Sequence, residues 1–93
     1  MFITFEGLDF SGKSTQAKLL HEYLGSKNIK SILLREPGGT TISEKVREII
    51  LDREHIEMTP LTEFMLFSAS RSQLVSQIIK PHLKKGYVVI CDR

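Results

Sequence analysis

The 93-residue sequence contains one cysteine, Cys91, no tryptophan and no long hydrophobic stretch. A single cysteine excludes an intrachain disulfide and any metal cluster built on several cysteines. No apolar run approaches the roughly 18 residues of a membrane-spanning helix, and no basic-then-apolar leader opens the chain. These absences lead us to expect a reduced, cytoplasmic protein with no membrane partner.

The chain also has little net charge. Thirteen lysines and arginines face eleven acidic residues, which leaves a net charge of +2. No block of about five like charges occurs, so the sequence does not favour a nucleic-acid partner. Hydrophobic residues at 41% and charged residues at 26% are ordinary for a globular protein. We therefore expect a single folded domain over residues 1–93.

Strand-like and helix-like patterns alternate along the chain. The expected strands are 2–5, 31–34 and 87–91, and the expected helices are 13–24, one starting at 41, and one running from 59–60 to 85. The order β-α-β-α-α-β predicts a parallel sheet with right-handed crossovers, in a three-layer α/β/α fold. This sheet is expected to be incomplete, with strand 2–5 presenting an unpaired apolar edge.

Capping residues predict where the helices begin. Thr41 and Glu44 have the spacing of a capping box, and Thr59 followed by Pro60 is typical of an N-cap and a first helical position. Pro81 is expected to kink or restart the long helix. The buried stripe of that helix is expected to contain Leu61, Phe64, Met65, Ser68, Val75, Ile78 and Ile79.

The segment Gly7–Ser14 carries the strongest functional signal. Its sequence, GLDFSGKS, matches the phosphate-binding pattern G-x-x-x-x-G-K-[ST], with a strand before it and a helix after it. Glycines let successive backbone N–H groups surround a phosphate, Lys13 reaches the β- and γ-phosphates, and Ser14 offers a hydroxyl to Mg²⁺. The residues expected to hold the ATP phosphates are Gly7, Leu8, Asp9, Phe10, Ser11, Gly12, Lys13, Ser14 and Thr15.

This motif predicts nucleoside triphosphate binding but leaves the reaction open, because motors, GTPases and small-molecule kinases share it. Three further segments narrow the choice: Arg35–Thr40, Phe67–Arg71 and Asp92–Arg93. Taken with Phe5–Asp9, they resemble the amino-terminal half of the thymidylate kinase family. The resemblance runs along the whole chain and implies the parallel fold of a nucleoside monophosphate kinase.

Phe67 and Arg71 are four residues apart, so they lie on one helical face. An aromatic ring beside a guanidinium suits a flat base that carries carbonyl oxygens. The alternative is a core Phe67 and a solvated Arg71. In the family that the chain resembles, the matching residues hold the thymine.

Arg35 and Arg93 end two strands at the edge where the phosphate loop lies. Two cations there suit the phosphate of an acceptor nucleotide, whereas Arg35 could instead form a surface ion pair with Glu36. The resemblance implies that both arginines contact the phosphate of thymidine 5′-monophosphate (dTMP). It also implies that Pro37 and the glycines after it line that phosphate.

Two acidic residues complete the candidate site. Asp92 follows an apolar strand, as expected for a carboxylate that orients Mg²⁺, although it could simply cap the strand end. Asp9 lies within the phosphate loop, and the resemblance implies that it faces the acceptor sugar; it could otherwise be a turn residue. The expected catalytic set is therefore Lys13, Asp9, Arg35 and Arg93, with Ser14 and Asp92 for the metal.

The resemblance implies transfer of the γ-phosphoryl group of ATP to dTMP, and a homodimer at full length. Phe10 occupies a loop position where some family members carry arginine, so the transition-state arginine should come from a lid beyond residue 93. We accordingly expect the 93-residue piece alone to be inactive. The alternatives are another nucleotide kinase of the same fold, or a non-catalytic nucleotide-binding fragment that needs a partner chain.

Overall fold

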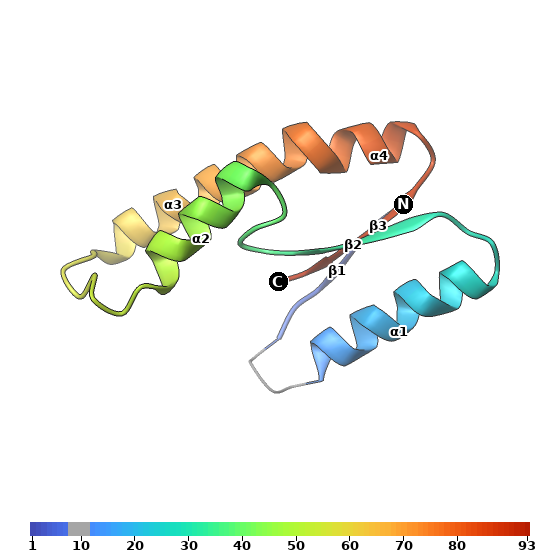
Figure 1. The fold of residues 1–93 in the computed structure, drawn as a ribbon, viewed down its shortest axis with the longest axis horizontal. Coiled ribbons are helices and arrows are strands. Elements are labelled where there is room, and N and C mark those ends of the chain that lie inside the picture. Colours follow the sequence, from blue (N-terminus) through green and yellow to red (C-terminus); the bar gives the residue numbers. More distant parts are fainter. Residues whose placement is uncertain (8–11) are drawn as a thin grey trace.

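A three-stranded parallel sheet forms the centre of the structure, a computed structural model that describes residues 1–7 and 12–93. Its strands are β1 (Phe2–Phe5), β2 (Ser31–Arg35) and β3 (Val88–Asp92), in the order β1-β3-β2 (Figure 1). The register pairs β1 with β3 and β2 with β3 in parallel. The predicted parallel sheet is thus confirmed, with β1 at an edge.

Helices cover both faces of this sheet, as the sequence predicted. Helix α1 (Lys13–Ser26) packs against one face, and the segment that leads into β3 lies on the other (Figure 1). That segment consists of α3 (Pro60–Leu74), η1 (Val75–Ile79) and α4 (Lys80–Lys84). The α/β layering places the carboxyl ends of the strands and the start of α1 at the same end of the sheet.

Helix α2 (Thr41–Leu51) packs beside α3, and both helices begin at a threonine cap. Thr59 caps α3 as predicted, with its hydroxyl accepting from the Thr62 N–H. The prediction of Thr41 as the cap of α2 is wrong by one residue. Thr40 is the N-cap and accepts from the Ser43 N–H at 2.9 Å. The glutamate that was expected to complete a capping box instead accepts from the Gly39 N–H.

The long helix predicted from residue 59 to 85 changes its hydrogen-bonding pattern just before Pro81. Its wider π-helical turn, η1, comes just before α4, which restarts with Pro81 in its first turn. Proline has no N–H to donate to the preceding turn, so a change of hydrogen bonding there is expected. Within the described ranges, no helix has the length and apolar character needed to cross a membrane.

The core lies between β3 and the α3–η1 segment. It contains Leu74, Ile79, Val89 and Cys91, all buried. Burial, and to a lesser degree the nearby carboxylate of Glu36, raises the pKa of the Cys91 thiol to about 11. Because the thiolate is the reactive form, this buried thiol acts as a packing group of the core.

The predicted stripe of the long helix is only half correct. Ile79 is buried, but Leu61, Phe64 and Met65 are each more than half exposed. These three residues belong to the first turns of α3, which extend past the end of the sheet (Figure 1). Helical periodicity identifies an apolar face, but it does not tell whether another element of the same chain covers that face.

We expect Gly39→Ala to destabilise the loop between β2 and α2. Gly39 has φ +99°, and an added Cβ would lie 2.6 Å from Cδ1 of the buried Leu74. Backbone strain and the clash should lower the free energy of unfolding by about 1–3 kcal/mol. Urea unfolding of the full-length gene product measures this change.

Gly25→Ala is the matched control for that substitution. Gly25 lies inside α1, and an added Cβ would meet nothing within 4 Å. Alanine there should raise the free energy of unfolding by about 0.5–1 kcal/mol, because glycine is a poor helix former. Equal effects of the two substitutions would contradict the conformation described for Gly39.

Candidate functional site

The start of α1 meets the carboxyl end of β3 through three side chains. Nζ of Lys13 lies 2.6 Å from Oδ1 of Asp92, and Oγ of Ser14 donates to Oδ2 of the same carboxylate at 2.5 Å. Gly12 precedes the helix with φ +87°, a left-handed conformation that favours glycine. The structure thus brings together the lysine, hydroxyl and carboxylate that the sequence assigned to phosphates and metal.

These two partners stabilise the ionised form of the Asp92 carboxylate. Burial opposes its charge, but the hydrogen bonds from Lys13 and Ser14 and the lysine charge outweigh that effect and hold the pKa of Asp92 below its ordinary value. A hydroxyl and a carboxylate side by side are hard oxygen donors of the kind that Mg²⁺ prefers. This pair of groups therefore fits a magnesium ion, which Ser14 and Asp92 would hold.

A cavity of about 360 Å³ opens beside this group. Four of its lining residues are cationic, which makes it suitable for phosphate groups. The lining consists of Lys13, Ser14, Arg35, Glu36, Pro37, Arg47, Leu51, Asp92 and Arg93. The cavity therefore collects both arginines and the proline that were assigned to the acceptor phosphate. Arg47 was not foreseen; its Nη1 donates to the Pro37 carbonyl at 2.8 Å.

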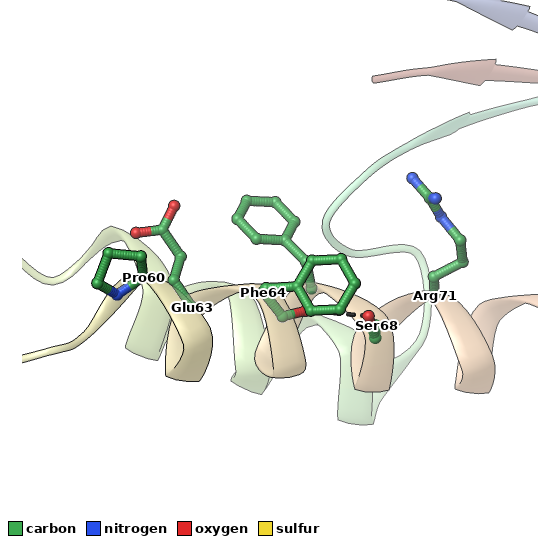
Figure 2. Close-up of a pocket in the computed structure, with 6 residues that line it drawn as sticks. Pro60, Glu63, Phe64, Ser68 and Arg71 are labelled. Carbon is green, nitrogen blue, oxygen red and sulfur yellow. Dashed lines mark hydrogen bonds between the residues drawn. The ribbon is translucent and has the colours of Figure 1, made fainter.

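A second cavity, of about 370 Å³, lies along α3. Pro60, Glu63, Phe64, Phe67, Ser68 and Arg71 line it. Glu63 and Arg71 project on the same side of the helix (Figure 2). Phe67 is partly exposed and shares this cavity with Arg71, so the structure brings the aromatic ring and the guanidinium together in one recess.

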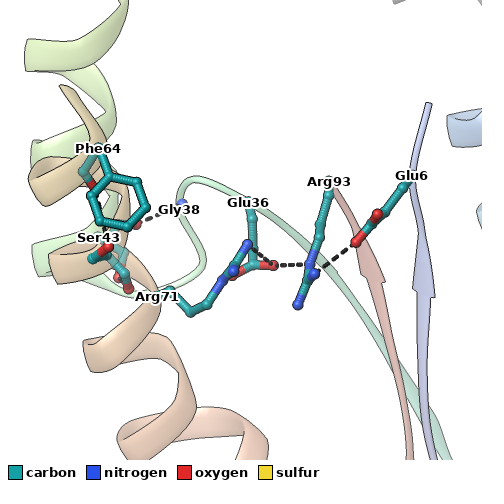
Figure 3. Close-up of polar contacts among 9 residues, drawn as sticks. Glu6, Glu36, Gly38, Ser43, Phe64, Arg71 and Arg93 are labelled. Carbon is teal, nitrogen blue, oxygen red and sulfur yellow. Dashed lines mark hydrogen bonds and ion pairs between the residues drawn. The ribbon is translucent and has the colours of Figure 1, made fainter. Parts of the chain in front are cut away.

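Glu36 joins the two cavities. Its Oε1 accepts from Nε of Arg71 at 2.9 Å, and its Oε2 accepts from Nε of Arg93 at 2.8 Å. Arg93 also donates from Nη1 to Glu6 at 2.7 Å, so a line of ion pairs crosses from α3 to the end of β1 (Figure 3). Burial alone would lower the pKa of Arg93, but the carboxylates of Glu6 and Glu36 raise it.

Arg35 forms an ion pair with Glu44, and not with Glu36, which the sequence analysis considered as its partner. Its Nη2 lies 2.9 Å from Oε2 of Glu44, while Glu36 turns toward Arg71 and Arg93. Successive side chains at a strand end point to opposite sides, so Arg35 and Glu36 diverge. The hydrogen bond from Arg35, with that from the Gly39 N–H, lowers the pKa of the half-buried Glu44.

The remaining candidates of the phosphate loop divide into three groups. Gly7 is exposed and lies two residues after the end of β1. Leu8, Asp9, Phe10 and Ser11 lie outside the described residues. Thr15 is exposed in the first turn of α1, at the end of the helix that faces the cation-rich cavity.

The missed residues, Glu36 and Arg47, left only a weak signal in the sequence. Each is a charged residue with no pattern of its own, and one lies between better-marked neighbours in the segment Arg35–Pro37. Their positions follow from packing between α2, α3 and the sheet, which local sequence does not encode.

Comparisons with known proteins agree with this geometry. Residues 5–93 match the family model for thymidylate kinase. Two similar curated proteins are the thymidylate kinases of Roseiflexus castenholzii and Thermosipho africanus, both 56% identical over the whole chain. This chain spans 41% and 46% of their respective lengths.

A solved structure is also similar. The crystal structure of thymidylate kinase from Ehrlichia chaffeensis has a TM-score of 0.90 and 46% sequence identity. The match covers all of this chain and 52% of that one.

Proposed function

The chain belongs to the thymidylate kinase family, and from this premise we propose that the protein transfers the γ-phosphoryl group of ATP to dTMP. The products would be ADP and thymidine diphosphate. An acceptor phosphate oxygen forms a bond to the γ-phosphorus, and the bond between that phosphorus and the β,γ-bridging oxygen breaks, so that the oxygen leaves with ADP. One observation carries the proposal. A cation-lined cavity beside the phosphate-loop lysine is connected through Glu36 to an aromatic recess that holds an arginine.

The cation-lined cavity supports binding of both phosphate groups. Lys13 neutralises the β- and γ-phosphates of ATP, while Arg35 and Arg93 lie on the same edge, where an acceptor phosphate would meet the donor. Catalysis of phosphoryl transfer rests on alignment and on cations spread over the moving charge. The acceptor phosphate is already ionised at neutral pH, so no strong general base is required.

The recess on α3 supports recognition of the acceptor base. Phe67 offers an aromatic face, and Arg71 presents N–H donors to the carbonyl oxygens of a pyrimidine. Ser14 and Asp92 would hold Mg²⁺, which when bound stabilises negative charge on the phosphate oxygens. Hydrogen bonds from Lys13 and Ser14 hold the Asp92 carboxylate in position.

An acceptor panel tests the proposal. The full-length gene product, with ATP and Mg²⁺, should form ADP with dTMP at a kcat/KM well above that with uridine, cytidine or adenosine monophosphate. A preference for another monophosphate would favour the second candidate, a different nucleotide kinase of this fold. ATP binding without ADP formation with any acceptor would favour a non-catalytic nucleotide-binding protein.

We also propose that residues 1–93 alone bind nucleotide at best and turn over negligibly. The chain spans under half the length of the curated relatives it matches, and the transition-state arginine is absent from position Phe10. Purified 93-residue chain and full-length gene product should be compared in the same ADP assay. Steady ADP formation by the shorter chain would refute this proposal.

A homodimer is the assembly we propose at full length. Helices α2 and α3 present exposed apolar side chains, and a second copy would bury them. Those more than half exposed that line neither site cavity are Ile42, Leu61 and Met65. Light scattering on the full-length protein should give twice the chain mass, and a monomer mass would count against the assembly.

A further inference from the structure

We propose that Glu36 is a positioning residue that fixes Arg71 and Arg93 as one unit, so that base recognition and acceptor-phosphate alignment depend on each other. This inference rests on the proposed kinase function. Arg71 belongs to the recess on α3, and Arg93 belongs to the cation-lined cavity. The carboxylate of Glu36 is hydrogen-bonded to both guanidinium groups (Figure 3).

Glu36 is itself held in place from two directions. Its backbone N–H donates to the Asp92 carbonyl at 2.9 Å, which ties it to the carboxyl end of β3. Its side chain is only 6% exposed, in contrast to 49% for Arg71 and 28% for Arg93. A buried carboxylate between two more exposed arginines acts as their anchor, because the guanidinium groups have more freedom to move than it has.

The two arginines keep donors for substrate while they are anchored. A guanidinium group has five N–H donors. Arg93 uses Nε and Nη1, and Arg71 uses Nε with a longer 3.4 Å contact from Nη2. Within residues 1–7 and 12–93, the other N–H groups of both arginines have no hydrogen-bond partner. Glu36 therefore fixes the orientation of each group while using only part of its donors.

Charge and geometry predict opposite effects when Glu36 is changed. Two arginines and the carboxylates of Glu36 and Glu6 make a cluster that is neutral as a whole. Removing one carboxylate strengthens the attraction for an anionic phosphate, so the charge change alone does not weaken dTMP binding. It also releases the two guanidinium groups from their fixed directions, which misaligns the acceptor and lowers kcat.

The test uses Glu36→Gln and Glu36→Asp in the full-length gene product, with Glu22→Gln, an exposed carboxylate on α1, as control. For Glu36→Gln we expect kcat with dTMP to fall about tenfold or more while its KM stays level or falls. Glu36→Asp keeps the charge but is shorter by about 1.5 Å, so it cannot hold both arginines and should also lower kcat. The kcat/KM preference for dTMP over deoxycytidine monophosphate should narrow in both variants.

Each other outcome overturns the inference. An unchanged kcat, or a raised KM for dTMP at normal kcat, would mean that Glu36 does not align the acceptor. An unchanged kcat/KM preference for dTMP over deoxycytidine monophosphate would mean that Glu36 does not orient Arg71. A joint rise in the KM values of ATP and dTMP with a lower melting temperature would indicate a merely structural role. Failure of the proposed function looks different, since the unsubstituted protein would then form no ADP with dTMP.

Discussion

Replacement of Lys13 with methionine is expected to lower kcat/KM for phosphoryl transfer by about 10²–10³-fold, the loss typical of one group that stabilises transition-state charge. Methionine keeps much of the side-chain length but carries no charge. In the proposed mechanism the ammonium group, which lies 2.6 Å from Oδ1 of Asp92, contacts the β- and γ-phosphates. Steady-state ADP formation in the full-length gene product measures the effect.

Lys18→Met is the matched control for this substitution. Lys18 is an exposed lysine on the same helix, α1, and lines neither of the two site cavities. Its replacement should leave kcat/KM within about twofold, as for surface changes away from the site. Circular dichroism checks that Lys13→Met remains folded, because that change leaves Asp92 without its cation. A folded Lys13→Met protein with normal activity would remove the phosphate loop from the mechanism.

Arg71→Met is expected to lower kcat/KM for dTMP by about 100-fold, as loss of charge-assisted hydrogen bonds to a bound base would. The KM for ATP should change little, because Arg71 lines the recess on α3 and not the cation-lined cavity. Initial rates with each substrate varied in turn separate the two effects.

Arg53→Met provides the comparison, because Arg53 is exposed in the loop after α2 and lines neither site cavity. It should behave as the unsubstituted protein does. If Arg71→Met raised the KM of ATP as much as that of dTMP, the assignment of the α3 recess to the acceptor base would be wrong.

The sequence predicted the parts of the fold that depend on local pattern. The parallel sheet follows from alternating strand and helix signals, and Thr59 with Pro60 marked the start of α3 correctly. The meeting of Lys13 with Asp92 was also predictable, because a phosphate-loop helix and the end of a parallel strand lie at the same end of a sheet. The first two features are set by local pattern, and the third follows from the parallel arrangement of the strands.

The features that depend on tertiary packing were not predictable. The cap of α2 is Thr40, which is buried together with Ser43, and the Ser43 hydroxyl donates to the Ser70 carbonyl of α3. Arg35 pairs across to Glu44 on α2, and Glu36 reaches two arginines that are 35 and 57 positions away in sequence. Such long-range contacts have no local pattern, so only the folded chain reveals them.

One measurement tests the central claim most directly: a crystal structure of the full-length gene product with dTMP, Mg²⁺ and a non-hydrolysable ATP analogue. We expect Nζ of Lys13 to contact the triphosphate, Arg93 to contact the acceptor phosphate, and the thymine to lie between Phe67 and Arg71. A thymine bound outside the α3 recess, or a triphosphate that does not touch Lys13, would contradict the account.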